Sequence, residues 1–413
     1  MSLFRSFVPF ADITVHEERT MHPFAFLAQV GALVPFFLES VFAANASEWR
    51  SRSIYQVMID RYAPANGSQV GHCDQSLGIY CGGTWRGLQD NLDYIQGMNF
   101  DAVWISPVVA NIPNWTADGE AYAGYWQQDL FSINEAFGSE DDLQNLITEI
   151  HKRGMYFMLD IVVNHMAFDG PADQVDYKTF HPFNDEKYFH KYCKSGYNDH
   201  DLENLENCWL GSDEVPLADI DTEDDFVQQL FGMWIQNQVW KFGVDGLRID
   251  AGINVDPAFF PPFMEAANTF ALGEVYTAHD EIACQWEGPI GSILNYPLYW
   301  RITDAFSSPD GSMGDLADIL SSERKNCHDP TLFGTFSEVS SSHNTAYASF
   351  ANIRRIMMYR ASATTQTTSP KPRTWQLFSL CPMAYQLSIR VRSSTSRAAR
   401  THLRTASLFG NMA

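Results

Sequence analysis

Short apolar runs alternate with longer amphipathic stretches along most of this chain. The runs are rich in β-branched and aromatic residues, a composition typical of strands buried in a parallel sheet. The stretches between them predict helices over Asp141–Lys152 and from about Asp225 to Lys241, because apolar residues recur there at helical spacing. The predicted strands are Ile54–Ile59, Ala102–Ile105, Tyr156–Val163, Gly246–Asp250, Phe270–Val275, Ser292–Tyr296 and Leu332–Phe336.

Alternating strands and helices predict an α/β fold, and seven such strands favour a (β/α)8 TIM barrel over an open sheet. The connection from His165 to Asp224 is rich in aromatic residues, Asp and Asn. A loop of that length without structure of its own would be unusual, so it predicts a subdomain inserted after the third strand. The expected division is barrel domain A at 47–165 and 224–350, with the inserted domain B at 166–223.

The charge of the chain limits its partners and changes abruptly near the C-terminus. A net charge of −23 argues against nucleic acid, because an acidic surface repels phosphate. Residues 351–413 contain ten Lys and Arg but no Asp or Glu. We interpret them as an aberrant, disordered basic tail from an out-of-frame or wrongly joined exon, lacking an eighth strand and a C-terminal β-sandwich. A basic tail that binds an acidic partner is the alternative.

The N-terminal region predicts export. An apolar run from Phe24 to Leu38 is followed by small residues at Ala43, Ala44 and Ala46. The run is short for a membrane span, so 1–46 is interpreted as an extension followed by a signal peptide. We therefore expect a secreted protein without a membrane span in its mature chain.

The cysteines agree with an extracellular location. Cys73 lies near Cys81 and Cys193 near Cys208, which leaves Cys284 and Cys327 as a possible third pair. The seventh cysteine, Cys381, lies in the basic tail, and the other six, an even number after a signal peptide, indicate disulfides rather than a metal site. Two glycosylation acceptor sequences, at Asn66 and Asn114, fit the same location.

Acidic or amide residues lie at the ends of three of the predicted strands: Asp160 to Asn164 on the third, Asp250 on the fourth and Glu274 on the fifth. The C-terminal strand ends form the active-site face of a barrel, so Asp250 and Glu274 should point into one cleft. Two carboxylates so placed are what retaining glycoside hydrolysis requires. Arg248 should lie on the same side of its strand as Asp250 and keep that carboxyl ionised. The alternative is a structural ion pair.

Several longer strings resemble glycoside hydrolase family 13, in particular fungal α-amylases of the Taka-amylase type, from about Ser47 to Phe336. They are Gly246-Leu-Arg-Ile-Asp250, Gly273-Glu274-Val275, Asp160-Ile-Val-Val-Asn164-His165, Cys81-Gly-Gly-Thr-Trp85, Leu92-Asp-Tyr-Ile-Gln-Gly-Met98, Gly124-Tyr-Trp-Gln-Gln-Asp129 and Leu294-Asn-Tyr-Pro297. The resemblance implies a monomeric, calcium-dependent enzyme that cleaves internal 1,4-α-glucosidic bonds of starch-like α-glucan with retention.

The resemblance also implies roles for individual residues. Asp250 would be the nucleophile and Glu274 the general acid and base, with Arg248, Tyr125, Trp126 and His165 at the substrate. Calcium would bind Asn164, Asp219 and the main-chain carbonyls of Glu206 and Asn254, an all-oxygen set that suits a hard cation. The implied disulfides are Cys73–Cys81, Cys193–Cys208 and Cys284–Cys327.

The chain departs from the family at three places. Ile253 and Asn254 replace a Lys-His pair on the leaving-group side, and Ala123 replaces a histidine before Gly124. These changes would weaken leaving-group binding, so a 4-α-glucanotransferase is an alternative function. The segment 337–344 contains no aspartate where the family has its third catalytic one. We therefore expect an impaired enzyme, or a catalytically dead glucan-binding relative.

Overall fold

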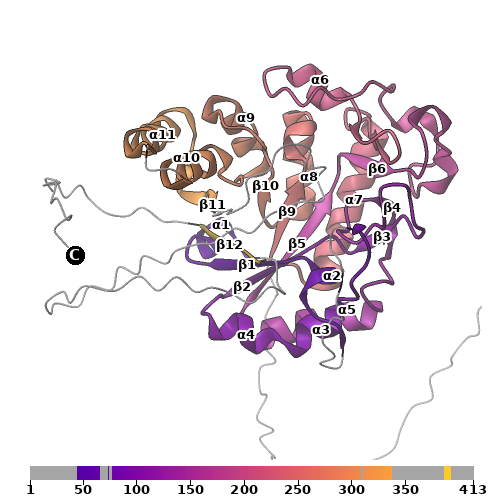
Figure 1. Cartoon of the computed structure of the whole chain (residues 1–413), viewed down its shortest axis with the longest axis horizontal. Coiled ribbons are helices and arrows are strands. Elements are labelled where there is room, and N and C mark those ends of the chain that lie inside the picture. Colours follow the sequence, from indigo (N-terminus) through magenta and orange to yellow (C-terminus); the bar gives the residue numbers. More distant parts are fainter. Residues whose placement is uncertain (1–43, 66–72, 74–76, 308–309, 337–385, 392–413) are drawn as a thin grey trace, which may run out of the picture. The chain divides into compact units, whose positions relative to one another are not determined.

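The computed structural model describes residues 44–65, 73, 77–307, 310–336 and 386–391. Its centre is a seven-stranded sheet in the order β10-β9-β5-β2-β1-β12-β11. Five of these strands, β1, β2, β5, β9 and β10, are parallel to one another, and their colours in Figure 1 advance with the sequence across the sheet. The strands are β1 Ser53–Val57, β2 Ala102–Ile105, β5 Tyr156–Val162, β9 Gly246–Asp250, β10 Phe270–Gly273, β11 Gly334–Thr335 and β12 Gln386–Val391.

The predicted strand at Ser292–Tyr296 is present only as two isolated bridges. Gly273 pairs in parallel with Ile293, and Leu294 pairs in parallel with Gly334. Residues 293–294 therefore lie between β10 and β11, where the sixth strand of a barrel belongs. Parallel strands joined through helices in this order define a fold of the (β/α)8 TIM-barrel type.

One short part of the C-terminal segment belongs to the sheet. Within 351–413, Gln386–Val391 form β12, which pairs antiparallel with both β1 and β11. An antiparallel strand is not the parallel eighth strand of a barrel, so that strand is still missing from the described residues. The rest of 351–413, and all of 1–43, lie outside them.

Helices connect the strands and begin and end at residues suited to those positions. Helix α5 (Glu140–Lys152) has a capping box between Ser139 and Asp142. Helix α7 (Asp225–Phe242) is capped by Asp224 and ends at Gly243, whose φ of 65° is left-handed. The others are α1 Ala46–Trp49, α2 Ile59–Tyr62, α3 Trp85–Asp90, α4 Leu92–Gly97, α6 Leu202–Asn207, α8 Phe260–Ala267, α9 Asp280–Ile290, α10 Tyr296–Ser307 and α11 Met313–Asn326.

The connection after β5 has structure of its own, as its length predicted. Its three-stranded antiparallel sheet has the order β6-β8-β7, with β6 His165–Ala167, β7 Leu210–Gly211 and β8 Pro216–Asp219. A separate pair joins β3 (Val109–Asn111) to β4 (Gln127–Ile133). The 3-10 turns are η3 Ala172–Gln174, η4 Tyr177–Thr179, η5 Glu186–Tyr188, η6 Gly252–Asn254, η7 Pro257–Phe259 and η8 Pro330–Leu332.

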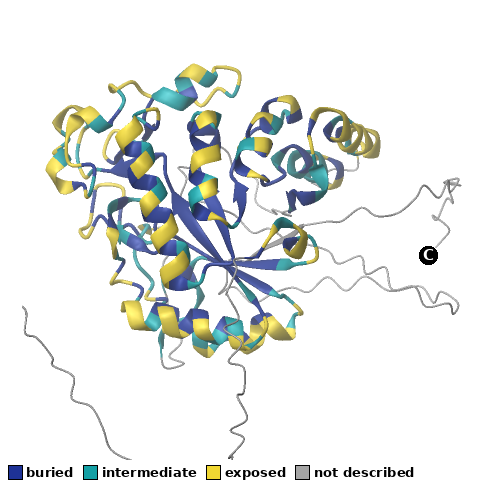
Figure 2. Cartoon of the chain, turned by 180° about the vertical axis from the view of Figure 1, so that it is seen from behind, coloured by how far each residue is buried: buried dark blue, intermediate teal, exposed yellow. Residues whose placement is uncertain are grey.

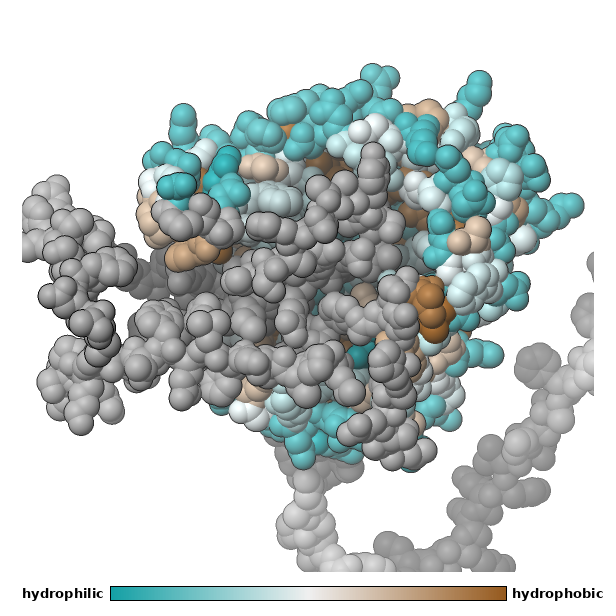
Figure 3. Space-filling model, viewed as in Figure 1, coloured by the Kyte–Doolittle hydropathy of each residue, from teal (hydrophilic) through white to brown (hydrophobic). Residues whose placement is uncertain are grey.

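The strands and the outer surfaces of the helices differ in their exposure to solvent. The five parallel strands of the sheet are largely buried, and the helices turn exposed residues outward (Figure 2). Hydrophilic residues predominate among those coloured along the margin of Figure 3. Three disulfides confirm the implied pairing of Cys73–Cys81, Cys193–Cys208 and Cys284–Cys327. Within the described ranges, we find no helix with the length and apolar character that crossing a bilayer requires.

Candidate active site

One arginine brings together carboxyl groups that lie on, or directly after, three neighbouring strands. Arg248 on β9 is 1% exposed, and its Nη1 donates to Asp160 Oδ1 at 2.9 Å and to Asp250 Oδ1 at 2.7 Å. Its Nη2 lies 2.7 Å from Glu274 Oε2. The two predicted carboxylates, Asp250 and Glu274, therefore meet on different nitrogens of one guanidinium.

The backbone explains this convergence. Side chains two residues apart on a strand point to the same side, so Arg248 and Asp250 share one face of β9. Asp160 on β5 lies directly opposite Arg248 in the parallel register. After β9 the chain turns sharply at Ala251, whose φ of 51° is left-handed. This turn directs the Ala251 N–H to Glu274 Oε2 at 3.1 Å, and such local strain is common at functional sites.

Two opposing influences act on the pKa of Asp250. Arg248 lowers this pKa, as expected, but the net shift is well above the ordinary value. Burial is the largest cause, and Glu274 and Asp160 add repulsion that the single guanidinium does not offset. Burial also raises the pKa of Asp160. The three carboxyl groups therefore compete for one arginine.

The site also contains three residues to which the sequence analysis assigned no role, namely Asp160, Trp104 and Tyr296. Asp160 Oδ2 accepts hydrogen bonds from Trp104 Nε1 at 2.9 Å and from the Tyr125 hydroxyl at 2.8 Å. Tyr296 donates its hydroxyl to Glu274 Oε1 at 2.9 Å. The sequence alone could have indicated Asp160 as a site residue, because it is an acidic residue inside an apolar strand. Trp104 and Tyr296 look like core aromatics in the sequence, and only the fold shows their partners.

The predicted substrate residues lie beside this cluster. Tyr125 is buried, with its hydroxyl on Asp160, and Trp126 is half-buried and packs against a small apolar cluster. His165 is buried, and burial lowers its pKa to about 4. Its Nε2 lies 3.0 Å from the Tyr125 carbonyl oxygen, so the neutral ring donates there and holds the main chain of Tyr125.

Oxygen atoms from three predicted calcium ligands meet at the base of the inserted subdomain. The Asn164 side-chain oxygen lies 2.7 Å from the Asn254 main-chain oxygen and 3.2 Å from Asp219 Oδ1. Three such oxygens repel one another, so the contacts require either a rotated Asn164 amide or a cation between them. A hard cation such as Ca²⁺ takes oxygen ligands of these kinds, so the residues present fit calcium.

The fourth predicted calcium ligand, Glu206, lies near the other three. It is in α6, and its neighbour Leu205 accepts a hydrogen bond from Asn254 Nδ2 at 3.0 Å. The pKa of its carboxyl is raised to about 7 by burial and by the charges of Asp256 and Glu223. This accumulation of negative charge also favours a cation nearby.

Comparison with known proteins indicates the same family that the sequence motifs resemble. Residues 56–332 match the family model described as "Alpha amylase, catalytic domain". "Alpha-amylase 1" of Lipomyces kononenkoae is 44% identical over 300 residues, which are 72% of this chain and 48% of that protein. "Alpha-amylase" of Saccharomycopsis fibuligera is 43% identical over 317 residues, 76% of this chain and 64% of that protein.

A solved structure supports the assignment. The α-amylase from Malbranchea cinnamomea is 44% identical, with a TM-score of 0.69, over 72% of this chain and 62% of that one. The chain therefore belongs to the α-amylase catalytic-domain family of glycoside hydrolases. It spans between about half and two thirds of the length of these relatives.

Proposed function

We propose that the site of this chain is built for α-amylase-type hydrolysis of internal 1,4-α-glucosidic bonds, with retention, in a starch-like glucan. The observation that carries the proposal is the convergence of Asp250 and Glu274 on one buried guanidinium. Retaining glycosidases use two carboxyl groups about 5–5.5 Å apart, and partners of a single guanidinium are held close together.

In the proposed mechanism, Asp250 attacks the anomeric carbon while Glu274 protonates the departing glycosidic oxygen. The bond between the sugar and that oxygen breaks, and a covalent glycosyl ester forms on Asp250. Glu274 then removes a proton from water, whose oxygen attacks the same carbon and releases Asp250. Arg248 and the Ala251 N–H hold Glu274 through Oε2, and the Tyr296 hydroxyl holds it through Oε1.

We propose that this particular chain is a slow enzyme. Residues 337–344 supply no aspartate to bind sugar hydroxyls in the transition state, although they lie outside the described part of the structure. Losing one preorganised polar group of a catalytic site costs about 3 kcal/mol of barrier, or about 10²-fold or more in rate.

The test is the release of reducing ends from soluble starch, and from maltooligosaccharides, by the full chain and by Asp250→Asn and Glu274→Gln. Slow internal cleavage that both substitutions abolish is the expected result. Lengthened oligosaccharides would instead indicate a 4-α-glucanotransferase, and starch binding without any turnover a catalytically dead relative. Either result, or activity that both substitutions leave intact, contradicts the proposal.

We propose that calcium supports the junction between the inserted subdomain and the barrel through Asn164, Asp219 and the carbonyls of Glu206 and Asn254. A cation there would relieve the repulsion among the converging oxygens. Removing calcium with EGTA should lower the melting temperature by several degrees, and adding calcium should restore it. Asp219→Asn should reduce this response, whereas a response equal to that of the unmodified chain would contradict the site.

We further propose that the protein is secreted and acts as a monomer on polysaccharide outside the cell. The proposal is supported by the apolar run within 1–46 and by three disulfides, which form in oxidising compartments. Expression in a fungal host should place the protein in the medium, with its N-terminus cleaved near Ala46. Retention inside the cell with an intact N-terminus would contradict it.

A further inference from the structure

Two histidines and an aspartate meet where the inserted subdomain approaches the barrel. Among the described residues, three groups of side chains place potential metal-ligand atoms within 4.8 Å of one another. Cys284 and Cys327 of one group are disulfide-bonded. A second group surrounds His190, which binds Asp219 of the calcium junction. The third group is Asp199, His200 and His279, and the proposed function gives it no role.

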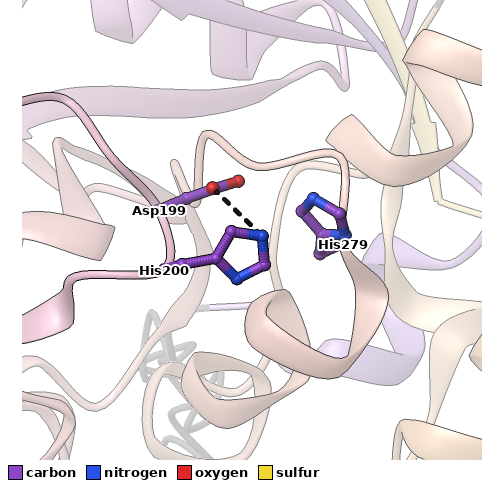
Figure 4. A group of neighbouring side chains, drawn as sticks. All are labelled: Asp199, His200 and His279. Atoms are coloured by element: carbon purple, nitrogen blue, oxygen red, sulfur yellow. Dashed lines mark ion pairs between the residues drawn. The ribbon is translucent and has the colours of Figure 1, made fainter.

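The three side chains of this group face one another from two segments that are far apart in the sequence (Figure 4). Asp199 and His200 precede α6, whereas His279 precedes α9 in the loop that follows Glu274. The two imidazole rings are 4.7 Å apart between centroids, and His200 Nε2 lies 4.0 Å from Asp199 Oδ1. The groups are accessible, since the His200 side chain is 62% exposed.

The carboxylate is held in place by its own neighbour. The Thr277 hydroxyl donates to Asp199 Oδ2 at 2.6 Å, which leaves Oδ1 directed towards His200. A hydrogen bond to the outer oxygen of a ligand carboxylate is how proteins orient metal ligands. A further carboxylate, Glu281, has its Oε1 3.7 Å from His279 Nδ1 and can supply a fourth ligand after a small rotation.

We propose that Asp199, His200 and His279 form a site for a borderline divalent cation, Zn²⁺ in particular, that links the inserted subdomain to the loop after β10. Two imidazoles and a carboxylate are ligands that Zn²⁺ prefers, whereas calcium requires oxygen alone. Ligand atoms of a tetrahedral zinc are about 3.4 Å apart, a spacing that follows from bonds of about 2.1 Å. The ligand atoms of Asp199, His200 and His279, now within 4.8 Å of one another, therefore move closer together by about an ångström when the ion binds.

The position gives the ion a consequence for the cleft. Thr277 and His279 are three and five residues after Glu274, and Tyr276, directly before Thr277, contacts Tyr296 ring to ring. An ion that joins His279 to His200 restricts the movement of this loop relative to the inserted subdomain. We therefore expect zinc to protect 275–280 and 196–201 from hydrogen exchange.

The experiment titrates ZnCl₂ into the full chain with calcium in excess, by calorimetry and by thermal unfolding, so no readout depends on catalysis. One ion should bind with micromolar affinity and raise the melting temperature by a few degrees. His200→Ala and His279→Ala should each weaken binding about tenfold or more, and Thr277→Val by less. His181→Ala is the matched control, since His181 is 58% exposed and lies outside the group.

Co²⁺ provides a second readout that a general stability effect would not mimic. Its visible absorption should report tetrahedral coordination in the unmodified chain and in His181→Ala, and it should disappear in the His200→Ala, His279→Ala double variant. Zinc binding by that double variant with unchanged affinity, or binding that His181→Ala weakens equally, would overturn the site.

Discussion

Arg248 is the residue on which the site depends, because one guanidinium faces Asp160, Asp250 and Glu274 in a buried position. A buried ion pair contributes little net stability, yet removing one partner leaves a charge that has neither water nor a counter-ion. Because three carboxyl groups face one cation, neutralising a carboxyl group and neutralising the arginine should have opposite effects on stability.

Neutralising Asp250 should stabilise the protein at neutral pH. Its folded-state pKa is raised, so unfolding releases its proton, and the free energy of unfolding falls as pH rises above about 4, where an unfolded aspartate ionises. Asp250→Asn removes this loss while abolishing the proposed nucleophile. We expect denaturant unfolding to show about 1 kcal/mol of gain at pH 7 and little at pH 4. A gain that is larger at pH 4 would contradict the assignment.

Neutralising Arg248 should have the opposite effect. Arg248→Met leaves three buried carboxylates without their cation, which should cost about 3–5 kcal/mol. Arg86 is exposed, so Arg86→Met is the control and should change the free energy of unfolding by less than about 0.5 kcal/mol. Equal effects in urea denaturation would show that Arg248 has no special role in stability.

At the scale of single elements, local chemistry sets where the helices begin and end. Helix α7 begins after Asp224, whose side chain accepts from the N–H groups of Phe226 and Val227. It ends at Gly243, which takes the left-handed conformation that a side chain disfavours. Gly232 lies inside the same helix, where glycine only adds backbone entropy to the unfolded state.

The two glycines of α7 therefore predict opposite effects of one substitution. A Cβ at Gly243 would meet His151 Cε1 at 3.6 Å, and one at Gly232 would meet the Cβ of Ala266 at 3.6 Å, so neither clashes. Gly243→Ala should lose about 1 kcal/mol through backbone strain, and Gly232→Ala should gain up to about 1 kcal/mol. Thermal unfolding of the two variants tests this, and a shift of the same sign in both would refute the reasoning.

At the scale of the whole molecule, the sheet is completed by a strand from a segment of unlike composition. Strand β12 lies between β1 and β11 and covers the backbone edges that these two strands would otherwise expose among the described residues. Exposed strand edges favour association with other chains. The acid-free segment 351–413 therefore contributes a strand of six residues that pairs with both β1 and β11.

Two truncations separate the strand from the rest of that segment. A chain that ends after residue 385 lacks β12, whereas one that ends after residue 391 keeps it. The first should melt at a lower temperature than the second and form aggregates detectable by light scattering. Identical melting and scattering of the two would show that β12 does not support the sheet.

The sequence by itself determined the features that depend on local patterns. The bounds predicted for β2 and β9 match those observed, and those of α5 and α7 differ by about a residue, because side-chain period and end residues act within a few positions. The cysteine pairing and the proximity of Asp250 to Glu274 followed from resemblance to a family and from the rule that strand ends meet at one face. The pairing of Gln386–Val391 with β1 and β11 could not be predicted, since composition does not reveal which strand a segment will pair with.

Only the tertiary structure decided how charge and hydrogen bonds are shared. Burial and neighbouring carboxylates raise the pKa of Asp250 despite Arg248, because these contributions come from groups that the fold brings together. The bond from Tyr296 to Glu274 and the grouping of Asp199 with His279 likewise join residues at unrelated positions along the chain. Local patterns specify elements, whereas the energies of a site are sums over neighbours that only the folded chain supplies.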